Sequence, residues 1–292
     1  KIMVKYDALA ALPGGEPGPW GEPVTINYDQ RDVLLYSVGI GIRDLRYVYE
    51  GNPNFAVFPT FPIRWGGAGA PIDTSLVPSS PGPLNIDAER YLEMHEPLPT
   101  EGSVQVISRL IGVHPRGKGN GFVECESEVR SMEGEVLLRM VNGSFRRGVE
   151  QLGDIEPFEG IGETYSAKIE LPDTEPSVQV EALIPDNQAH IYRLSGDYNP
   201  LHIDPAAAKF GGFDEPILHG LCTFGHCGQL LLQKLCGGEV ARFRKIKVRF
   251  SSPVMLGDTI RIRAWEDGPG RVLFDAMVND KQVVSNAYFE YV

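Results

Sequence analysis

The chain contains 292 residues, of which 42% are hydrophobic and 23% are charged, and its formal net charge at pH 7 is −12. The length allows one large domain or two domains of about 100–200 residues each. The acidic balance excludes a general nucleic-acid binder, because such a protein needs a basic face to neutralise phosphates. No apolar run approaches the roughly 18–20 residues that cross a membrane, so no membrane span is expected.

The predicted elements begin with a helix and continue with strands. Residues 29–41 have apolar positions at helical spacing and end at a glycine, which predicts a helix. Residues 97–112, 122–131 and 135–147 alternate apolar and polar side chains between turn signals. This alternation predicts antiparallel strands.

The second half of the chain repeats this plan. Residues 187–199 again show helical spacing that breaks at a glycine, and residues 252–265, 271–278 and 282–292 again alternate. A repeat of this length indicates duplication of one structural unit. Each unit alone leaves a strand edge or a sheet face uncovered, so we expect the two units to pair edge to edge or face to face.

The two halves differ in the middle. Residues 217–238 are densely apolar and end in two glycines, which predicts a long buried helix. The corresponding residues 59–85 are rich in proline and glycine and cannot form a long helix. The first half is therefore expected to have a loop where the second has its central helix.

An acidic segment lies between the two halves; it contains glycine and proline and shows only weak periodicity, which is typical of a linker. We expect an N-terminal repeat over residues 1–150, a linker over residues 151–177 and a C-terminal repeat over residues 178–292. Aligning Tyr36 with Tyr192 places Gly41 opposite Asp197, so the two repeats differ at a position of chemical interest.

The stretch YRLSGDYNPLHIDP, residues 192–205, places Asp197, Asn199 and His202 within six residues. A helix is expected to end near the serine and glycine before Asp197, and the proline after Asn199 favours extended or turn backbone. Asp197 and His202 can then converge on one point. A carboxylate and an imidazole placed in this way can hold and deprotonate a water and return a proton, while the Asn199 amide binds the water or a ligand.

The same three residues also fit a purely structural turn. In that interpretation Asp197 caps the turn, Asn199 forms an Asx-turn, and His202 is a buried histidine with satisfied hydrogen bonds. Ser-Gly-Asp and Asn-Pro are common in loops, so the residue types alone leave both interpretations open.

The whole run resembles the hydratase 2 motif of the MaoC-like enoyl-CoA hydratases and matches it at every defining position. The resemblance continues through GGFDEPILHGLCTFG at residues 211–225. In the first half it covers YEG at residues 49–51, PTF at 59–61 and RYLEMHEPLP at 90–99. Nearly the whole chain is thus similar to this family, which includes the hydratase 2 units of peroxisomal multifunctional enzymes.

The resemblance implies an α+β double hot-dog fold, in which each repeat is a long helix wrapped by an antiparallel sheet. Only the second repeat is catalytic, and the degenerate central helix of the first leaves room for long or bulky acyl chains. The implied reaction is hydration of a trans-2-enoyl-CoA to a (3R)-3-hydroxyacyl-CoA in fatty-acid β-oxidation. Coenzyme A is part of the substrate, and the resemblance implies no cofactor and no metal.

The resemblance also assigns roles to single residues. Asp197 and His202 hold the water and share acid–base duty, with Asn199 assisting. Gly220 matches the family's oxyanion donor, and a glycine amide near a helix start suits the enolate charge that develops on the thioester oxygen. The alternative role of Gly220 is that of a small residue for helix packing.

Contacts to CoA are expected on the basic stretch RFRKIKVRF, residues 242–250. Lys247 and Arg249 alternate with apolar residues, so one face can meet phosphates while the other packs. A solvated strand face is the alternative. Phe250 matches a position that contacts ligand in the family.

The first half contributes further expected contacts to CoA. Arg116 stands where relatives place a basic CoA contact. Asp87 and Ala88 stand where relatives have a His-Gly contact pair. This departure speaks against recognition by the Asp87 side chain and leaves a backbone contact.

Metal and thiol chemistry have less support. His219, Cys222, His226 and Cys227 do not match a zinc-finger spacing, and on one helix they would face several directions, so packing is the expected role. No base partner is indicated for a nucleophilic cysteine. Four cysteines in a chain of this length do not form a disulfide framework, which indicates a reducing compartment.

Two alternatives to the hydratase stay open: a hot-dog dehydratase or thioesterase for other acyl thioesters, and a non-catalytic module that binds acyl-CoA. The resemblance implies a homodimer. It also implies a peroxisomal location, although no targeting signal is visible, and the cytoplasm and the mitochondrion are the alternatives.

Overall fold

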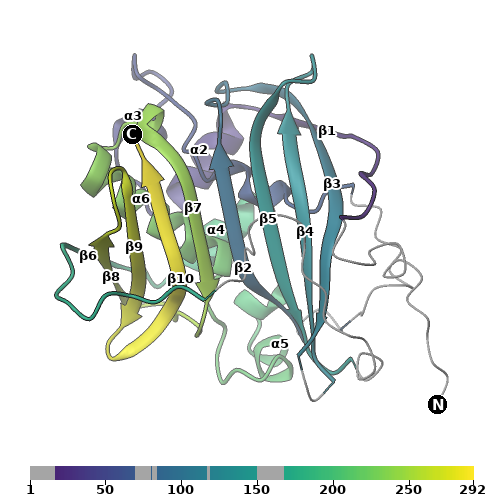
Figure 1. Ribbon diagram of the computed structural model, residues 1–292, viewed down its shortest axis with the longest axis vertical. Coiled ribbons are helices and arrows are strands. Elements are labelled where there is room, and N and C mark those ends of the chain that lie inside the picture. The colour runs from purple at the N-terminus through teal and green to yellow at the C-terminus, as the bar shows by residue number, and fades with distance from the viewer. Residues whose placement is uncertain (1–16, 70–79, 81–83, 117–118, 150–167) are drawn as a thin grey trace.

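The computed structural model describes residues 17–69, 80, 84–116, 119–149 and 168–292. Its main feature is one antiparallel sheet with the strand order β1-β3-β4-β5-β2-β7-β10-β9-β8-β6 (Figure 1). The first five strands in this order come from the first half of the chain, and the other five come from the second. The prediction of two repeats of one plan is therefore confirmed.

The strands of the first half are β1 (Val24–Tyr28), β2 (Asn85–Met94), β3 (Gly102–Pro115), β4 (Gly121–Arg130) and β5 (Val136–Arg146). Those of the second half are β6 (Val178–Leu183), β7 (Phe243–Phe250), β8 (Thr259–Glu266), β9 (Arg271–Val278) and β10 (Lys281–Tyr291). All six strand patterns in the sequence correspond to strands, but β1, β2 and β6 were not predicted. Strand β2 carries charges on both faces, which hides its alternation.

The two halves join edge to edge through β2 and β7. These strands pair antiparallel, with Leu92 opposite Ile246 and Tyr91 opposite Lys247. Because each half contributes an edge to this junction, neither half leaves a strand edge open there. Leu92 and Ile246 are both fully buried, so the junction belongs to the hydrophobic core.

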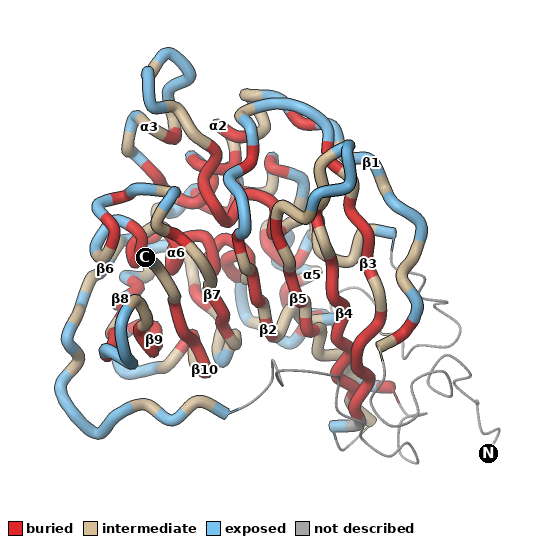
Figure 2. Tube along the Cα trace, turned by 45° about the horizontal axis from the view of Figure 1, so that its top comes forward, coloured by how far each residue is buried: buried red, intermediate tan, exposed pale blue. Residues whose placement is uncertain are grey.

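The long helix α6 (Gly220–Cys236) lies behind the sheet in Figure 1, together with α2 (Gln30–Gly39) and α4 (Gln188–Tyr192). Its C-cap is Gly237, whose φ of 62° is the left-handed conformation that ends many helices. The helix starts three residues later than predicted, because the backbone is still extended at His219, where ψ is 134°. Figure 2 shows the buried residues along the strands and α6.

The short helices complete the connections. They are α3 (Leu45–Val48), η2 (Phe61–Trp65), η5 (Arg193–Ser195), η6 (Pro200–His202), α5 (Pro205–Phe210) and η7 (Val240–Arg242). In the first half η2 occupies the place of a central helix, and it buries Phe61 and Ile63 completely. The expected replacement of a long helix by a proline- and glycine-rich segment is thus confirmed for residues 59–69.

The two helices equated in the repeat alignment pack against each other. The rings of Tyr36 in α2 and Tyr192 in α4 are 6.2 Å apart, edge to face. A Cβ atom on Gly39 would lie only 3.3 Å from the Cα of Tyr192, so the glycine allows the close approach. Helix α2 starts with a capping box formed by Asp29 and Asp32.

The predicted linker is described only from residue 168 onward. Ile169 and Leu171 pack on the sheet face opposite the helices, beside Tyr91 and Tyr288. The indole of Trp265 donates a hydrogen bond of 2.7 Å to the carbonyl of residue 174. Residues 151–167 of that prediction lie outside the described residues. None of the described helices has the length and apolar character needed to cross a membrane.

Candidate active site

The site is built on a tight turn between α4 and α5. The helical backbone ends at Gly196, whose φ of 120° requires a glycine, as the sequence predicts. Asn199 is extended, with ψ of 121°, and its Oδ1 accepts a hydrogen bond of 3.1 Å from Leu201 N. Oδ1 of Asp197 accepts one of 3.2 Å from Asn199 N. These bonds are those of the structural interpretation, but they leave the Asn199 amide hydrogens and most acceptor capacity of Asp197 for a ligand.

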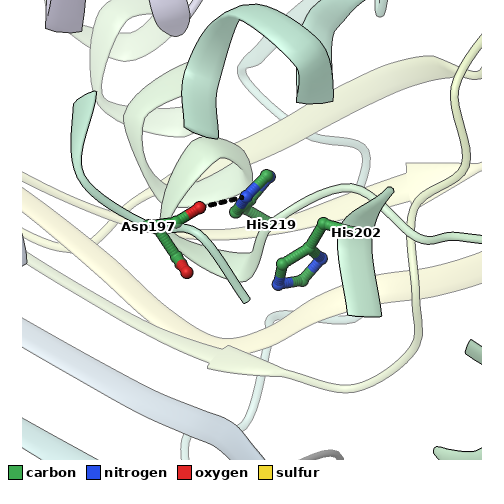
Figure 3. A group of neighbouring side chains, drawn as sticks. All are labelled: Asp197, His202 and His219. Atoms are coloured by element: carbon green, nitrogen blue, oxygen red, sulfur yellow. Dashed lines mark hydrogen bonds between the residues drawn. The ribbon is translucent and has the colours of Figure 1, made fainter. Parts of the chain in front are cut away.

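Three side chains converge beside this turn: Asp197, His202 and His219 (Figure 3). Each offers one polar atom, and these atoms lie within 4.8 Å of one another. Nδ1 of His202 donates a hydrogen bond of 2.9 Å to Ile217 O. This bond fixes the tautomer and leaves Nε2 as the acceptor.

His219 contacts both Asp197 and His202. Its Nε2 donates a hydrogen bond of 3.2 Å to the backbone carbonyl of Asp197, and its ring stacks on that of His202 with centroids 3.8 Å apart. The residue is fully buried. His219 therefore positions both the carboxylate and the imidazole.

Burial sets the protonation of the histidines. Loss of hydration lowers the pKa of His202, while the Ile217 carbonyl, Asp197 and Asp87 oppose the shift. The same desolvation lowers the pKa of His219 to about 3. Both rings are therefore neutral at pH 7, and His202 can accept a proton.

The N-terminus of α6 faces the same space. Gly220 is the first helical residue, so its N–H is one of the amides without an acceptor in the helix. A Cβ atom there would lie 3.3 Å from the ring of Phe250, which packs against this residue. The helix dipole adds partial positive charge at this point, and together with the amide it suits a developing oxyanion.

These groups line one cavity of about 910 Å³. Of the residues predicted from the sequence, the structure brings nine to its wall: Asp87, Ala88, Arg116, Asp197, Asn199, His202, Gly220, Arg249 and Phe250. They come from both halves of the chain, and the cavity therefore spans the junction between the repeats. A volume of this size fits a drug-sized or acyl ligand.

Asp87 faces the cavity from β2 as half of an ion pair. Its two carboxylate oxygens accept hydrogen bonds of 2.8 and 3.0 Å from Arg90 Nε. Burial raises the pKa of the Asp87 carboxyl, Arg90 opposes the shift, and Asp197 adds to it. Both carboxylates line the same cavity.

Two basic residues at the cavity differ in their surroundings. Arg116 is exposed, with its guanidinium 5.2 Å from the ring centroid of Phe122. Arg249 forms an ion pair of 2.6 Å with Glu89 across the junction of β2 and β7. Arg116 is thus the more exposed of the two, and part of the charge of Arg249 is compensated by Glu89.

The structure corrects the expectation for Lys247. Its side chain is only 4% exposed, its Nζ donates a hydrogen bond of 3.0 Å to Asn286 O, and it lies 3.6 Å from Glu89 Oε2. Lys247 is not among the described residues that line the cavity. The alternation of the basic strand is as predicted, but Lys247 on its charged face turns to Glu89 of the neighbouring strand rather than to the cavity, which Arg249 of the same face does line.

The geometry of the three converging side chains does not suit a metal ion. The rings of His202 and His219 are nearly parallel, at 27°, so their lone pairs do not point to a common centre. The other candidates on α6 face different neighbours: the thiol of Cys222 lies 3.3 Å from Gly39 O, and His226 packs against Gly41. A bound water therefore fits between Asp197, His202 and His219 better than a cation does.

The sequence prediction missed several polar residues at the site, and three of them matter for its chemistry. His219 was assigned to packing, and its position directly before Gly220 is its signal in the sequence. Arg90 and Asn142 line the inner end of the cavity; Arg90 begins the stretch RYLEMHEPLP, but no role was assigned to it, and no motif marks Asn142. They are brought together because β2 and β5 pair with Arg90 opposite Asn142.

Comparison with known proteins agrees with this geometry. A family model for a MaoC like domain matches residues 164–287, and one for the MFE-2 hydratase 2 N-terminal domain matches residues 26–148. The "Probable enoyl-CoA hydratase 2" of Dictyostelium discoideum is 33% identical over 88% of both chains. The "Peroxisomal hydratase-dehydrogenase-epimerase" of Neurospora crassa is 35% identical over 94% of this chain, which spans 30% of that relative.

Solved structures give the same result. A MaoC-like dehydratase from Phytophthora capsici superposes with a TM-score of 0.79, at 35% identity, over 93% of this chain and 95% of that one. A Mycobacterium tuberculosis protein described as having a double hotdog fold shares the fold, with a TM-score of 0.57 over 93% of this chain and 96% of that one, at 13% identity. The predicted double hot-dog fold is thereby confirmed. The chain belongs to the MaoC-like enoyl-CoA hydratase 2 family.

Proposed function

We propose that the protein hydrates trans-2-enoyl-CoA thioesters to (3R)-3-hydroxyacyl-CoA. The observation that carries this proposal is the convergence of Asp197 and His202 on one point beside the free amide of Gly220. The relatives named enoyl-CoA hydratase 2 from Dictyostelium discoideum and Arabidopsis thaliana support it.

The reaction proceeds by addition of one water across the double bond. Asp197 and His202 Nε2 accept hydrogen bonds from the water, and His202 takes one of its protons. The hydroxide oxygen bonds to C3, the π electrons move toward C2, and negative charge builds on the thioester oxygen. The imidazolium then returns the proton to C2. The oxygen and the hydrogen arrive from the same side, because one pair of side chains handles both, so addition is syn.

The amide of Gly220 stabilises the intermediate charge. Its N–H and the positive end of α6 act on the thioester oxygen only when that oxygen carries charge, which lowers the barrier. The Asp197 carboxylate stabilises the transient imidazolium at the same time. No electrons are transferred to or from the substrate, so the reaction needs no redox cofactor.

The test is hydration of trans-2-decenoyl-CoA by the purified chain, followed as loss of the absorbance of the conjugated thioester. Chiral analysis of the product is expected to give the (3R) alcohol. Release of free CoA, measured with a thiol reagent, would instead identify a thioesterase. Tight binding without turnover would identify a module that binds acyl-CoA.

The proposed setting is peroxisomal β-oxidation. Relatives from Neurospora crassa, Drosophila melanogaster and Arabidopsis thaliana all carry the word peroxisomal in their names. We also expect a homodimer, as the family resemblance implies. Cell fractionation tests the location, and light scattering of the purified protein tests the dimer.

A further inference from the structure

The inner end of the cavity is polar. Strands β2, β5 and β4 present Arg90, Asn142 and Cys125 side by side, and all three line the cavity. The next residues inward on the same face are Leu92 and Met140, which are fully buried in the core. The cavity therefore ends at a guanidinium, an amide and a thiol rather than at apolar side chains.

Arg90 has donors that no described residue accepts from. Its side chain is only 13% exposed, and its Nε binds both oxygens of Asp87. Within the described part of the chain, its two Nη groups donate to no acceptor. A purely hydrocarbon ligand would cover these donors without replacing their hydrogen bonds to water, which is unfavourable.

Asn142 gives independent support. The Oδ1 atom of its side chain is buried and has no hydrogen-bond partner among the described residues. The same atom lies 3.5 Å from the Cβ position of Gly66 and 3.7 Å from that of Gly67, so side chains at these positions would crowd it. Buried polar atoms are nearly always paired, and an unpaired one beside a cavity points to a polar ligand group.

The direction of the substrate follows from the two ends of the cavity. Arg116 is exposed at the outer end, where we expect the anionic nucleotide of CoA to stay in contact with solvent. Asp87 lines the same cavity as Asp197 and His202, and the charges of both act on its carboxyl. The reacting carbons are thus near Asp87, and the acyl chain beyond C3 runs inward to Arg90.

We propose that the inner end of the cavity binds a hydroxyl group on the acyl chain itself, several carbons beyond C3, whose oxygen accepts from Arg90 and whose O–H donates to Asn142 Oδ1. The inference rests on the proposed hydratase function and names its substrate class: oxygenated 2-enoyl thioesters. Asp87 compensates the charge of Arg90, so a neutral oxygen suits the site better than a carboxylate.

The experiment compares trans-2-decenoyl-CoA with derivatives that carry a hydroxyl group at successive positions of the chain beyond C3. For one position, kcat/KM is expected to exceed that of the plain substrate by roughly 10- to 100-fold, as for a hydrogen bond to a charged donor. Arg90→Met is expected to remove this preference. The double variant Asp87→Asn/Arg90→Met avoids leaving the Asp87 carboxylate unpaired, and it is also expected to lose the preference for the oxygenated substrate.

Arg109→Met is the matched control, because Arg109 also lies on a strand in an ion pair, 2.5 Å from Glu126, but is not among the described residues that line the cavity. It is expected to keep the preference. Equal turnover of plain and oxygenated substrates, or a preference that survives Arg90→Met, would overturn the inference.

A second experiment tests whether Arg90 contacts the acyl chain or the CoA part of the substrate. The comparison is repeated with N-acetylcysteamine thioesters, which lack most of CoA, and the effect of Arg90→Met is expected to persist. Its disappearance would assign Arg90 to the CoA arm and overturn the inference. If no thioester is hydrated, the proposed function fails. The inference is then decided by the Kd values of saturated plain acyl-CoA and of saturated acyl-CoA with the hydroxyl at the same position, which Arg90→Met is expected to equalise.

Discussion

His202 and His219 lie face to face, with ring centroids 3.8 Å apart. Burial lowers the pKa of both rings, so the proposed base His202 becomes protonated only below its ordinary pKa of 6.5. A neutral base loses activity only when pH falls through its lowered pKa. We therefore expect the acid limb of the profile of kcat/KM against pH to lie below pH 6.5. A pH–rate profile with its acid limb at or above 6.5 would contradict this assignment.

Removal of either member of the catalytic pair is expected to abolish most turnover. Asp197→Ala and His202→Ala should each lower kcat by roughly 10²–10⁴, as for lost general acid–base groups. The circular dichroism spectrum should remain that of the wild type. Asp204→Ala is the control, because Asp204 lies in the same motif but caps α5 through Ala206 N. Near wild-type turnover in either member of the pair would refute the mechanism.

The role of the Gly220 amide can be isolated by two substitutions. Gly220→Pro removes the N–H but keeps the helix, because proline is well tolerated at the first helical position and the residue before it is extended. Gly220→Ala keeps the N–H and adds a Cβ that crowds Phe250. We expect kcat to fall roughly 10²–10³-fold more in the proline variant than in the alanine variant. Similar kcat values in the two would exclude the amide as oxyanion donor.

Lys247 and Arg116 are expected to have opposite roles. Lys247→Met leaves Glu89 less compensated and Asn286 O without its donor, so it should lower the free energy of unfolding by about 1–3 kcal/mol with little change in KM. Arg116→Gln should raise KM for CoA esters, more at low salt, because Arg116 is exposed at the cavity. Urea unfolding and initial-rate kinetics at two ionic strengths measure both. A raised KM in the Lys247 variant would instead support the prediction that Lys247 contacts CoA.

Stability is expected to fall with acid because buried histidines resist protonation. Burial lowers the pKa of His226 to about 4, whereas in the unfolded chain this group takes up a proton near pH 6.5. Between these values the unfolded state binds the additional proton, so the free energy of unfolding decreases as pH falls, by about 1.4 kcal/mol per pH unit for one group. His226→Gln should reduce the difference in unfolding free energy between pH 6.5 and 5. An unchanged difference would show that His226 is protonated in the folded protein.

The sequence by itself determined the repeat, the turn and the long helix, because each depends on local spacing. The break at Gly196 needs a positive φ, and the proline after Asn199 restricts that residue to extended backbone. The dense apolar run with two terminal glycines specified α6 to within three residues. Even the alignment of Tyr36 with Tyr192 had a structural counterpart, since the two rings touch across the interface of the repeats.

Only the tertiary structure decided which polar groups meet in the cavity. The register of β2 against β5 places Arg90 beside Asn142, and the register of β2 against β7 places Tyr91 opposite Lys247. A strand's sequence gives the alternation of its faces, but not the partner of each face. For this reason the sequence treated Lys247 and Arg249 alike as CoA contacts. The fold buries Lys247 against Glu89, whereas Arg249 pairs with the same carboxylate and still lines the cavity.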